Sequence, residues 1–188
     1  MRSLLCILAG LFLISCAVSC KKNNSSPGGG SVQGNWLFLF LKAQTQSTIA
    51  TGTGETDVTK SSFTTTGNSG TIAFTADSMV SNGLAYSANF LATDYLYFGG
   101  SIYDSISMPF SESISPTSES VAYKQIGNDS LYFPGGGFTS PASGGSGSQA
   151  SGARYVIDKD TLKINVQASE TVSGGLETLN ETVYLLRQ

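Results

Sequence analysis

The sequence predicts an antiparallel all-β fold, and three observations support this prediction. Apolar and polar residues alternate over many short segments, as in strands with one buried face. Turn-forming Gly, Asn, Asp and Ser residues separate these segments, and no segment keeps a helical period. The chain has 188 residues, of which 40% are hydrophobic and 10% aromatic. This is enough for one packed domain once an N-terminal segment is set aside.

The composition excludes several classes of function. The chain has no histidine, so Ser–His and Cys–His couples are impossible and the commonest zinc ligand is absent. The net charge is −3, and without residues 1–19, which contribute one Arg and no acid, 9 basic and 13 acidic side chains leave −4. An acidic chain lacks the basic face that nucleic acids require. We therefore expect no nucleic-acid partner, no metal and no cofactor.

Residues 1–19 have the pattern of an export signal. Arg2 gives a positive start, and Leu4 to Ile14 form an apolar run of signal-peptide length. This run is shorter than the roughly 20 residues that a membrane-spanning helix needs. We therefore expect the chain to be exported and the segment to be removed.

The end of this segment resembles the lipobox of bacterial lipoproteins, in which a small residue precedes a lipidated cysteine. Residues 13–16 fit the general pattern more closely, whereas residues 17–20 are followed by two lysines, as in many Bacteroidetes lipoproteins. Lipidation of Cys20 leaves no other thiol in the mature chain, but lipidation of Cys16 leaves an odd thiol in an oxidising compartment. We therefore expect lipidation at Cys20, with Cys16 as the alternative and a plainly cleaved signal as a third interpretation.

Residues 20–33 are expected to form a flexible tether, because Asn23 to Ser31 offer no apolar side chain to bury. The domain is then expected to cover residues 34–188. Gly34 to Leu41 hold the only tryptophan in the densest apolar run of this domain, which we interpret as a strand buried on both faces.

Short predicted strands follow in order. Residues 62–66 and 71–76 flank Gly67 to Gly70, whose composition predicts a hairpin connection. Pro109 lies inside the segment 101–111 and predicts an edge position or a bulge there. Further strands are predicted at residues 84–90, 95–98, 121–126 and 131–133.

The last part of the domain combines a loop, a repeat and two strands. Residues 134–152 are almost entirely Gly, Ser, Pro and Ala, and we expect this long loop to be mobile. Residues 126–133 and 157–164 repeat one pattern, Ile-x-x-Asp-Ser/Thr-Leu, which predicts strand, tight turn and strand. Residues 162–169 alternate as a half-buried strand, and residues 179–187 form the last one.

Four features of the chain are the lipoprotein signal, Gly34-x-Trp36, the two predicted hairpins and the C-terminal Leu-Leu-Arg-Gln. Through these features the chain resembles the lipocalin-like lipoproteins of Bacteroidetes. The resemblance implies an antiparallel lipocalin-like β-barrel of about 8–10 strands, with an immunoglobulin-like β-sandwich as the alternative fold. In lipocalins the Trp of this motif lies across one barrel end and a late Arg packs over it. The resemblance therefore implies a barrel-closing motif of Gly34, Trp36 and Arg187, with the indole buried and its N–H hydrogen-bonded.

The resemblance also implies a function. It implies a lipoprotein that its N-terminal lipid anchors to the outer membrane of the cell envelope, on the periplasmic or the surface side. This lipoprotein would bind a small apolar or amphipathic ligand. The many Tyr and Phe residues suit such a lining, although core packing is their commoner role. The alternative is a structural or interaction accessory whose barrel is filled by its own side chains.

We do not expect an enzyme. A glycosidase-like pair needs two carboxylates at a defined separation, and no spacing singles out two residues from the candidates Asp94, Asp104, Glu112 and Glu119.

A triplet of Asp, Ser or Thr, and an apolar residue resembles the acceptor motif for O-glycosylation of exported Bacteroidetes proteins. It occurs at residues 77–79, 104–106, 129–131 and 160–162. Turn chemistry already accounts for the last two copies. Ser78 and Ser105 are therefore the candidate acceptors.

Overall fold

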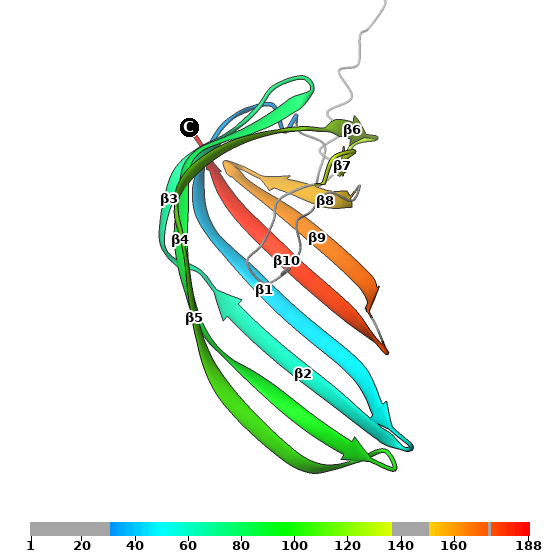
Figure 1. Cartoon of the computed structure of the whole chain (residues 1–188). Helices are drawn as coiled ribbons and strands as arrows, with labels where there is room; N and C mark the ends of the chain where they lie inside the picture. Colours follow the sequence, from blue (N-terminus) through cyan, green and yellow to red (C-terminus); the bar gives the residue numbers. More distant parts are fainter. Residues whose placement is uncertain (1–30, 137–150, 173) are drawn as a thin grey trace, which may run out of the picture.

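The computed structural model describes residues 31–136, 151–172 and 174–188, and within these ranges it contains ten strands and no helix. None of these residues forms a helix with the length and apolarity that a membrane span needs. The strands are β1 (Gly34–Gly52), β2 (Glu55–Thr64), β3 (Thr66–Phe74), β4 (Ser78–Phe98), β5 (Ser101–Ala122), β6 (Lys124–Ile126), β7 (Ser130–Phe133), β8 (Ser151–Asp158), β9 (Thr161–Val172) and β10 (Gly175–Arg187) (Figure 1).

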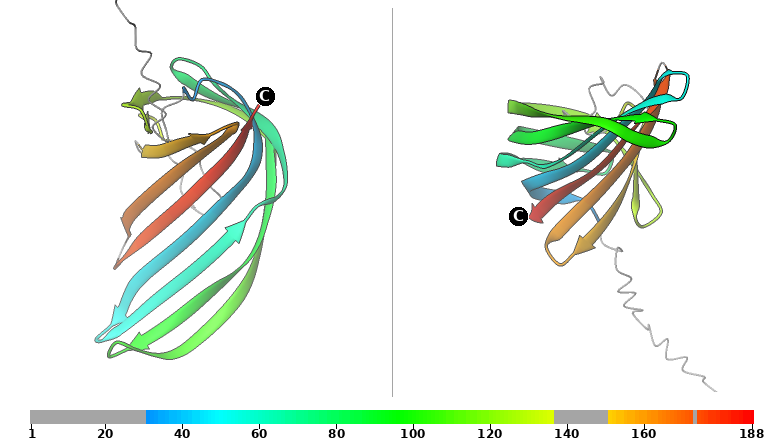
Figure 2. Two further views of the ribbon diagram at one scale, coloured as in Figure 1. Left: turned by 180° about the vertical axis from the view of Figure 1, so that it is seen from behind. Right: turned by 90° about the horizontal axis from the view of Figure 1, so that it is seen from below.

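All strands belong to one antiparallel sheet, which confirms the predicted all-β antiparallel fold. β1 is central: it pairs with β10 on one side, and with β3 and then β2 on the other. Among the described strands β5 pairs only with β4, and β6 ends the other side of the strand order. No pairing joins β5 to β6 in the part of the chain that the structure describes, so the sheet is curved but open (Figures 1 and 2). A single sheet also differs from the two packed sheets of a sandwich.

β1 is longer than predicted and is buried on one face only. Trp36 and Phe38 lie on the core face, and after a register shift between Phe38 and Phe40 the buried positions pass to Leu41 and Ala43. Such a bulge moves the pleat by one residue, so that the apolar run alternates between the two faces. The expectation of a strand buried on both faces is therefore wrong. The polar residues after Leu41 continue the strand because β2 and β10 pair with them on both sides.

Gly67 to Gly70 do not form the predicted hairpin. β2 and β3 follow one another along β1, both antiparallel to it, with only Thr65 between them. The Thr65 backbone N–H donates to the Leu41 carbonyl at 2.9 Å, and the Leu41 N–H donates to the Thr65 hydroxyl at 2.9 Å. The glycines accompany register shifts against β4, so their composition marks bulges within a strand rather than a chain reversal.

Both hairpins of the repeat are confirmed. β6 and β7 are joined by a turn at residues 127–129, and β8 and β9 by a turn at residues 159–160. Lys159 adopts a left-handed φ of 55°, as two-residue hairpin turns require. β8 begins at Ser151, so the last two residues of the predicted loop 134–152 belong to a strand. Residues 137–150, to which the expectation of mobility mainly applies, lie outside the described residues.

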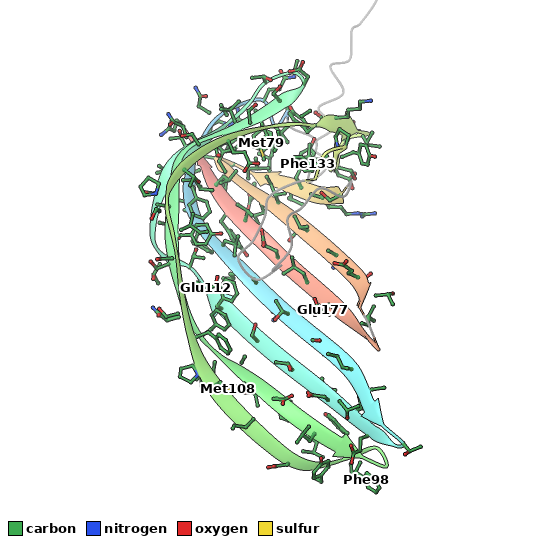
Figure 3. The ribbon with its side chains drawn as sticks, in the orientation of Figure 1. Met79, Phe98, Met108, Glu112, Phe133 and Glu177 are labelled. Carbon is green, nitrogen blue, oxygen red and sulfur yellow. The ribbon has the colours of Figure 1, made fainter. Side chains whose placement is uncertain are left out.

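The core lies at one end of the sheet, which we call the packed end. Trp36, Phe133, Tyr155, Leu162 and Leu185 are fully buried there, and Figure 3 shows Met79 and Phe133 at this end. The C-terminus also lies at this end (Figure 1). Burial decreases along the strands away from it. We call residues 44–62, 88–114 and 166–180 the distal half.

Val32 shows that the packed domain begins earlier than Gly34. This residue is completely buried although it falls in the segment expected to be a tether. Its carbonyl accepts the Trp36 indole N–H at 2.8 Å. The chain is thus fixed to the core at least two residues before β1. Residues 20–30 of the expected tether, which include Cys20, and the export signal at residues 1–19 with Cys16 lie outside the described residues.

Candidate ligand trough

An open trough of about 1510 Å³ crosses the distal half of the sheet. Six strands line it, and the lining from each strand includes one core-face residue. Enclosed small-molecule pockets are usually about 300–1,000 Å³, so the larger volume reflects the open side of the sheet. These core-face residues are Ala168 on β9, Leu179 on β10, Thr45 on β1, Ser61 on β2, Phe90 on β4 and Phe110 on β5.

Three aromatic rings run from the core into this trough. Phe63 stacks on Phe90 with ring centroids 4.8 Å apart, and Phe90 stacks on Phe110 at 5.6 Å. Phe90 and Phe110 are directly opposite in the register of β4 and β5, which places both rings on one face. Phe63 is buried whereas Phe110 is 44% exposed. We call these three residues the aromatic ladder, because it carries an apolar surface from the core to the open wall.

The wall formed by β5 stays apolar beyond this ladder. Ile106 and Met108 share the core face of β5 with Phe110, yet are 58% and 42% exposed (Figure 3). Among the described residues β5 is an edge strand that pairs with β4 alone, which leaves these two side chains without a neighbouring strand to cover them. The predicted edge position of Pro109 is thus confirmed, and a residue without an N–H suits an edge.

Hydroxyl groups line the neighbouring strands of the trough. The Thr45 and Ser61 hydroxyls are hydrogen-bonded at 2.7 Å across β1 and β2. Further along, the Thr59 hydroxyl donates to Asp94 Oδ1 at 3.4 Å across β2 and β4. The trough therefore has an aromatic side and a polar side.

Asp57 adds a second carboxyl beside Asp94. A hydrogen bond with the Asp94 carboxyl raises the pKa of Asp57, and burial and the charge of Asp94 raise it further. Its Oδ1 atom is buried and accepts no hydrogen bond from the described residues. The Asp57 carboxyl therefore keeps its proton to a higher pH than an isolated aspartate does. Sequence reasoning singled out Asp94 but missed Asp57, because only the pairing of β2 with β4 brings the two together.

Two further ionisable groups lie deeper on the core face. Glu181 on β10 is almost completely buried, as is Tyr86 on β4. Burial, followed by the negative charges of Glu181 and Glu112, raises the pKa of the Tyr86 phenol. Tyr86 therefore stays neutral at physiological pH and acts as a polar core residue.

The expected contact between Trp36 and Arg187 is present at the packed end. The two residues are directly opposite in β1 and β10, and the guanidinium carbon lies 4.5 Å from the indole centroid. Arg187 also donates to the Ser31 carbonyl at 3.4 Å. Gly34, with a φ of 133°, begins β1 two residues before the indole. These residues lie away from the trough and cover the core.

The other predicted sites are scattered. The Ser78 hydroxyl is half-buried and donates to Asp77 Oδ1 at 3.0 Å, whereas Ser105 is exposed on the edge strand β5. Of the four carboxylates considered for catalysis, the register places Asp94 on the core face of β4, and Asp104, Glu112 and Glu119 on the same face of β5. No group of three or more potential metal ligands gathers anywhere in the described ranges.

Comparisons with known protein families, with curated proteins and with solved structures found no significant match to this chain.

Proposed function

We propose that this protein is an exported, lipid-anchored binding module of the cell envelope, with an open lipocalin-like sheet that holds a small amphipathic ligand. The observation that carries this proposal is the trough itself. It joins the aromatic ladder on one side to hydroxyl groups on the other, and it is open to solvent.

The chemistry of the lining favours an amphipathic ligand over a purely apolar one. Apolar ligands are usually held in enclosed pockets that exclude water, and this trough is open on one side. An alkyl or ring surface would cover Phe90, Phe110 and Met108, while polar groups would reach Thr45 and Ser61 or remain in water. Covering about 100 Å² of apolar surface would contribute roughly 2–3 kcal/mol.

The alternative function, a structural accessory with a filled interior, has support at the packed end only. There Leu131, Tyr155 and Ile164 fill the interior completely. In the distal half the side chains of the described residues leave the trough open, which favours the binding module.

Binding can be tested with the mature chain carrying Cys20→Ser, which removes the lipid and keeps every described residue. We expect a fluorescent fatty-acid probe to bind this protein, and Phe110→Ser to weaken the affinity by about tenfold, because the ligand loses a large apolar contact. Leu186→Ser is the matched control, since Leu186 is also an exposed apolar residue but lies on the opposite face of β10. No binding, or equal effects of the two variants, would refute the proposal.

The anchor is tested separately by mass spectrometry of the mature N-terminus from a native-like host. Lipid on Cys20 is expected, and its acyl chains would hold the protein to a membrane at about 0.8 kcal/mol per buried CH₂. Lipid on Cys16 would move the site, and an unmodified mature N-terminus would refute the anchor. The intact mass also tests O-glycosylation, for which the exposed Ser105 is more accessible than the half-buried Ser78.

A further inference from the structure

The face of the sheet that points away from the core, which we call the outer face, has its own charge pattern. Successive residues of a strand point to opposite faces, and residues opposite each other in neighbouring strands share a face. By this register every acidic residue of β1, β2, β4, β5, β9 and β10 takes a core-face position. Glu181, for example, lies opposite the buried Ala43, and Glu112 lies opposite the buried Ala88. The outer face of these six described strands therefore carries no carboxylate.

The lysines of the same strands lie on the outer face, each against an aromatic ring. Lys42 Nζ is 5.7 Å from the centroid of the Tyr184 ring, and Lys163 Nζ is 6.0 Å from the same centroid. Lys60 Nζ is 5.8 Å from the centroid of the Tyr95 ring. Such contacts contribute only about 0.5–1 kcal/mol at exposed sites. They nevertheless hold the ammonium groups close to the sheet.

A row of amide side chains crosses the outer face beside these lysines. Gln167 on β9 lies opposite Asn180 on β10, and Asn180 lies opposite Gln44 on β1, two residues after Lys42. All three amide residues are exposed. Among the described residues their side-chain amides make no hydrogen bond, so they are available to a ligand. Neighbouring strands are about 4.8 Å apart, so the amides repeat at a spacing similar to the length of one sugar ring in an extended glycan.

We infer that the outer face binds an acidic polysaccharide, a glycan with carboxylate groups on its sugar rings. Side-chain amides both donate and accept hydrogen bonds, as sugar hydroxyls do, so the amide row suits the uncharged part of such a chain. The carboxylates of the glycan face Lys42 and Lys163. Because the outer face of the six strands has no carboxylate, a polyanion meets attraction there without local repulsion. This site lies on the other side of the sheet from the core-face residues of the trough, so the inference does not rest on the proposed function.

An anionic membrane is the other partner that these lysines could attract. Surfaces that enter a membrane interface present Trp, Phe or Leu next to their basic residues. The positions beside the amide row and Lys42 carry hydroxyl groups instead: Ser62 lies opposite Gln44, and Thr182 lies opposite Lys42. This chemistry favours the glycan.

The test uses two probes with the same sugar chain, a polygalacturonate oligosaccharide and its full methyl ester, which is uncharged. Each is titrated calorimetrically into the Cys20→Ser mature chain at neutral pH and low salt. We expect the acid to bind on the order of tenfold more tightly than the ester. Added salt should reduce this difference, because exposed charges are screened. Vesicles that contain anionic phospholipid should not co-sediment with the protein at physiological salt.

Variants locate the effect. Lys42→Gln combined with Lys163→Gln should bring the affinity for the acid down to that for the ester. Lys124→Gln combined with Lys159→Asn is the matched control, because it removes the same charge from exposed positions outside the six strands and should change the affinity little. Urea unfolding should give similar stability for both double variants, since all four lysines are surface residues.

Equal binding of the two glycans would overturn the inference, as would equal effects of the two double variants. Absence of glycan binding would also overturn it, and co-sedimentation with anionic vesicles in that case would assign the outer face to a membrane. Each of these results would leave the proposed function standing, because the fatty-acid probe and Phe110→Ser test the core face.

Discussion

Replacing Trp36 by Ala should remove a large part of the stability of this domain. The indole is completely buried, and an aromatic ring of this kind buries about 150–250 Å². At about 25 cal/mol per Å² the upper bound is roughly 4–6 kcal/mol, and measured aromatic-to-Ala losses are about 3–5 kcal/mol. The substitution also leaves the Val32 carbonyl without its 2.8 Å hydrogen bond. We therefore expect a loss of about 4 kcal/mol, against a total of about 5–15 kcal/mol for a typical domain.

Arg187→Ala should cost less and act through the same contact. The guanidinium lies 4.5 Å from the indole centroid, a geometry that contributes about 0.5–1 kcal/mol at exposed sites. The total loss should be about 1–1.5 kcal/mol, because the side chain also covers the ring and reaches the Ser31 carbonyl. The double variant can lose this contact only once. Its loss of unfolding free energy should therefore be smaller than the sum of the two single losses by about 0.5–1 kcal/mol.

Urea unfolding followed by far-ultraviolet circular dichroism is the suitable assay, since Trp36→Ala removes the only tryptophan. Arg154→Ala is the control: Arg154 is an exposed Arg with one 3.9 Å ion pair to Asp129, and its loss should be within about 0.5 kcal/mol. A loss below about 2 kcal/mol for Trp36→Ala would refute the reasoning on burial. Strictly additive losses would refute the energetic contact with Arg187.

Two other perturbations test the sheet. Gly70→Ala should cost at least about 2–3 kcal/mol in urea unfolding, because φ is 101° and an added Cβ would lie 2.6 Å from the Gly83 carbonyl oxygen. Gly67→Ala, with a φ of 60° and no atom near its Cβ, should cost only about 1 kcal/mol, and equal losses would contradict the close approach. The raised pKa of Asp57 means that the folded chain holds this proton more tightly than the unfolded chain, so stability falls as pH rises from 3.8 through the raised value. Asp57→Asn should therefore raise the melting temperature at neutral pH and lose this advantage well below pH 3.8; a difference independent of pH would contradict the assignment.

Features that depend on local chemistry could be predicted from the sequence. The two hairpins of the repeat depend on turn residues that act within a few positions, and both are present. The edge position of Pro109 follows from its missing N–H, and the one-sided burial of β9 from simple alternation. Each inference required only the chemistry of a residue and its immediate neighbours.

Features that depend on a distant partner could not be predicted. The break at Thr65 is stabilised by Leu41, 24 residues away, so the glycines that follow it were interpreted as a turn. The aromatic ladder joins Phe63, Phe90 and Phe110 from three strands, and only the register of β2, β4 and β5 brings their rings together. The pairing of Asp57 with Asp94 has the same origin. The register between strands depends on the whole sheet, so it cannot be predicted from the residue pattern of a single strand.

The gradient of burial along the strands separates the residues that stabilise this domain from those that would bind a ligand. Trp36, Tyr155 and Leu185 at the packed end have no exposed surface, so their substitution creates cavities and large stability losses. Phe110 in the trough and Met108 beside it on the same face of β5 are 44% and 42% exposed, so much of their apolar surface gains nothing from folding. A ligand could still bury that surface, which means that substitutions there should change affinity more than stability. The trough variants can therefore be interpreted as binding variants, because the elements that hold the fold together lie elsewhere on the same strands.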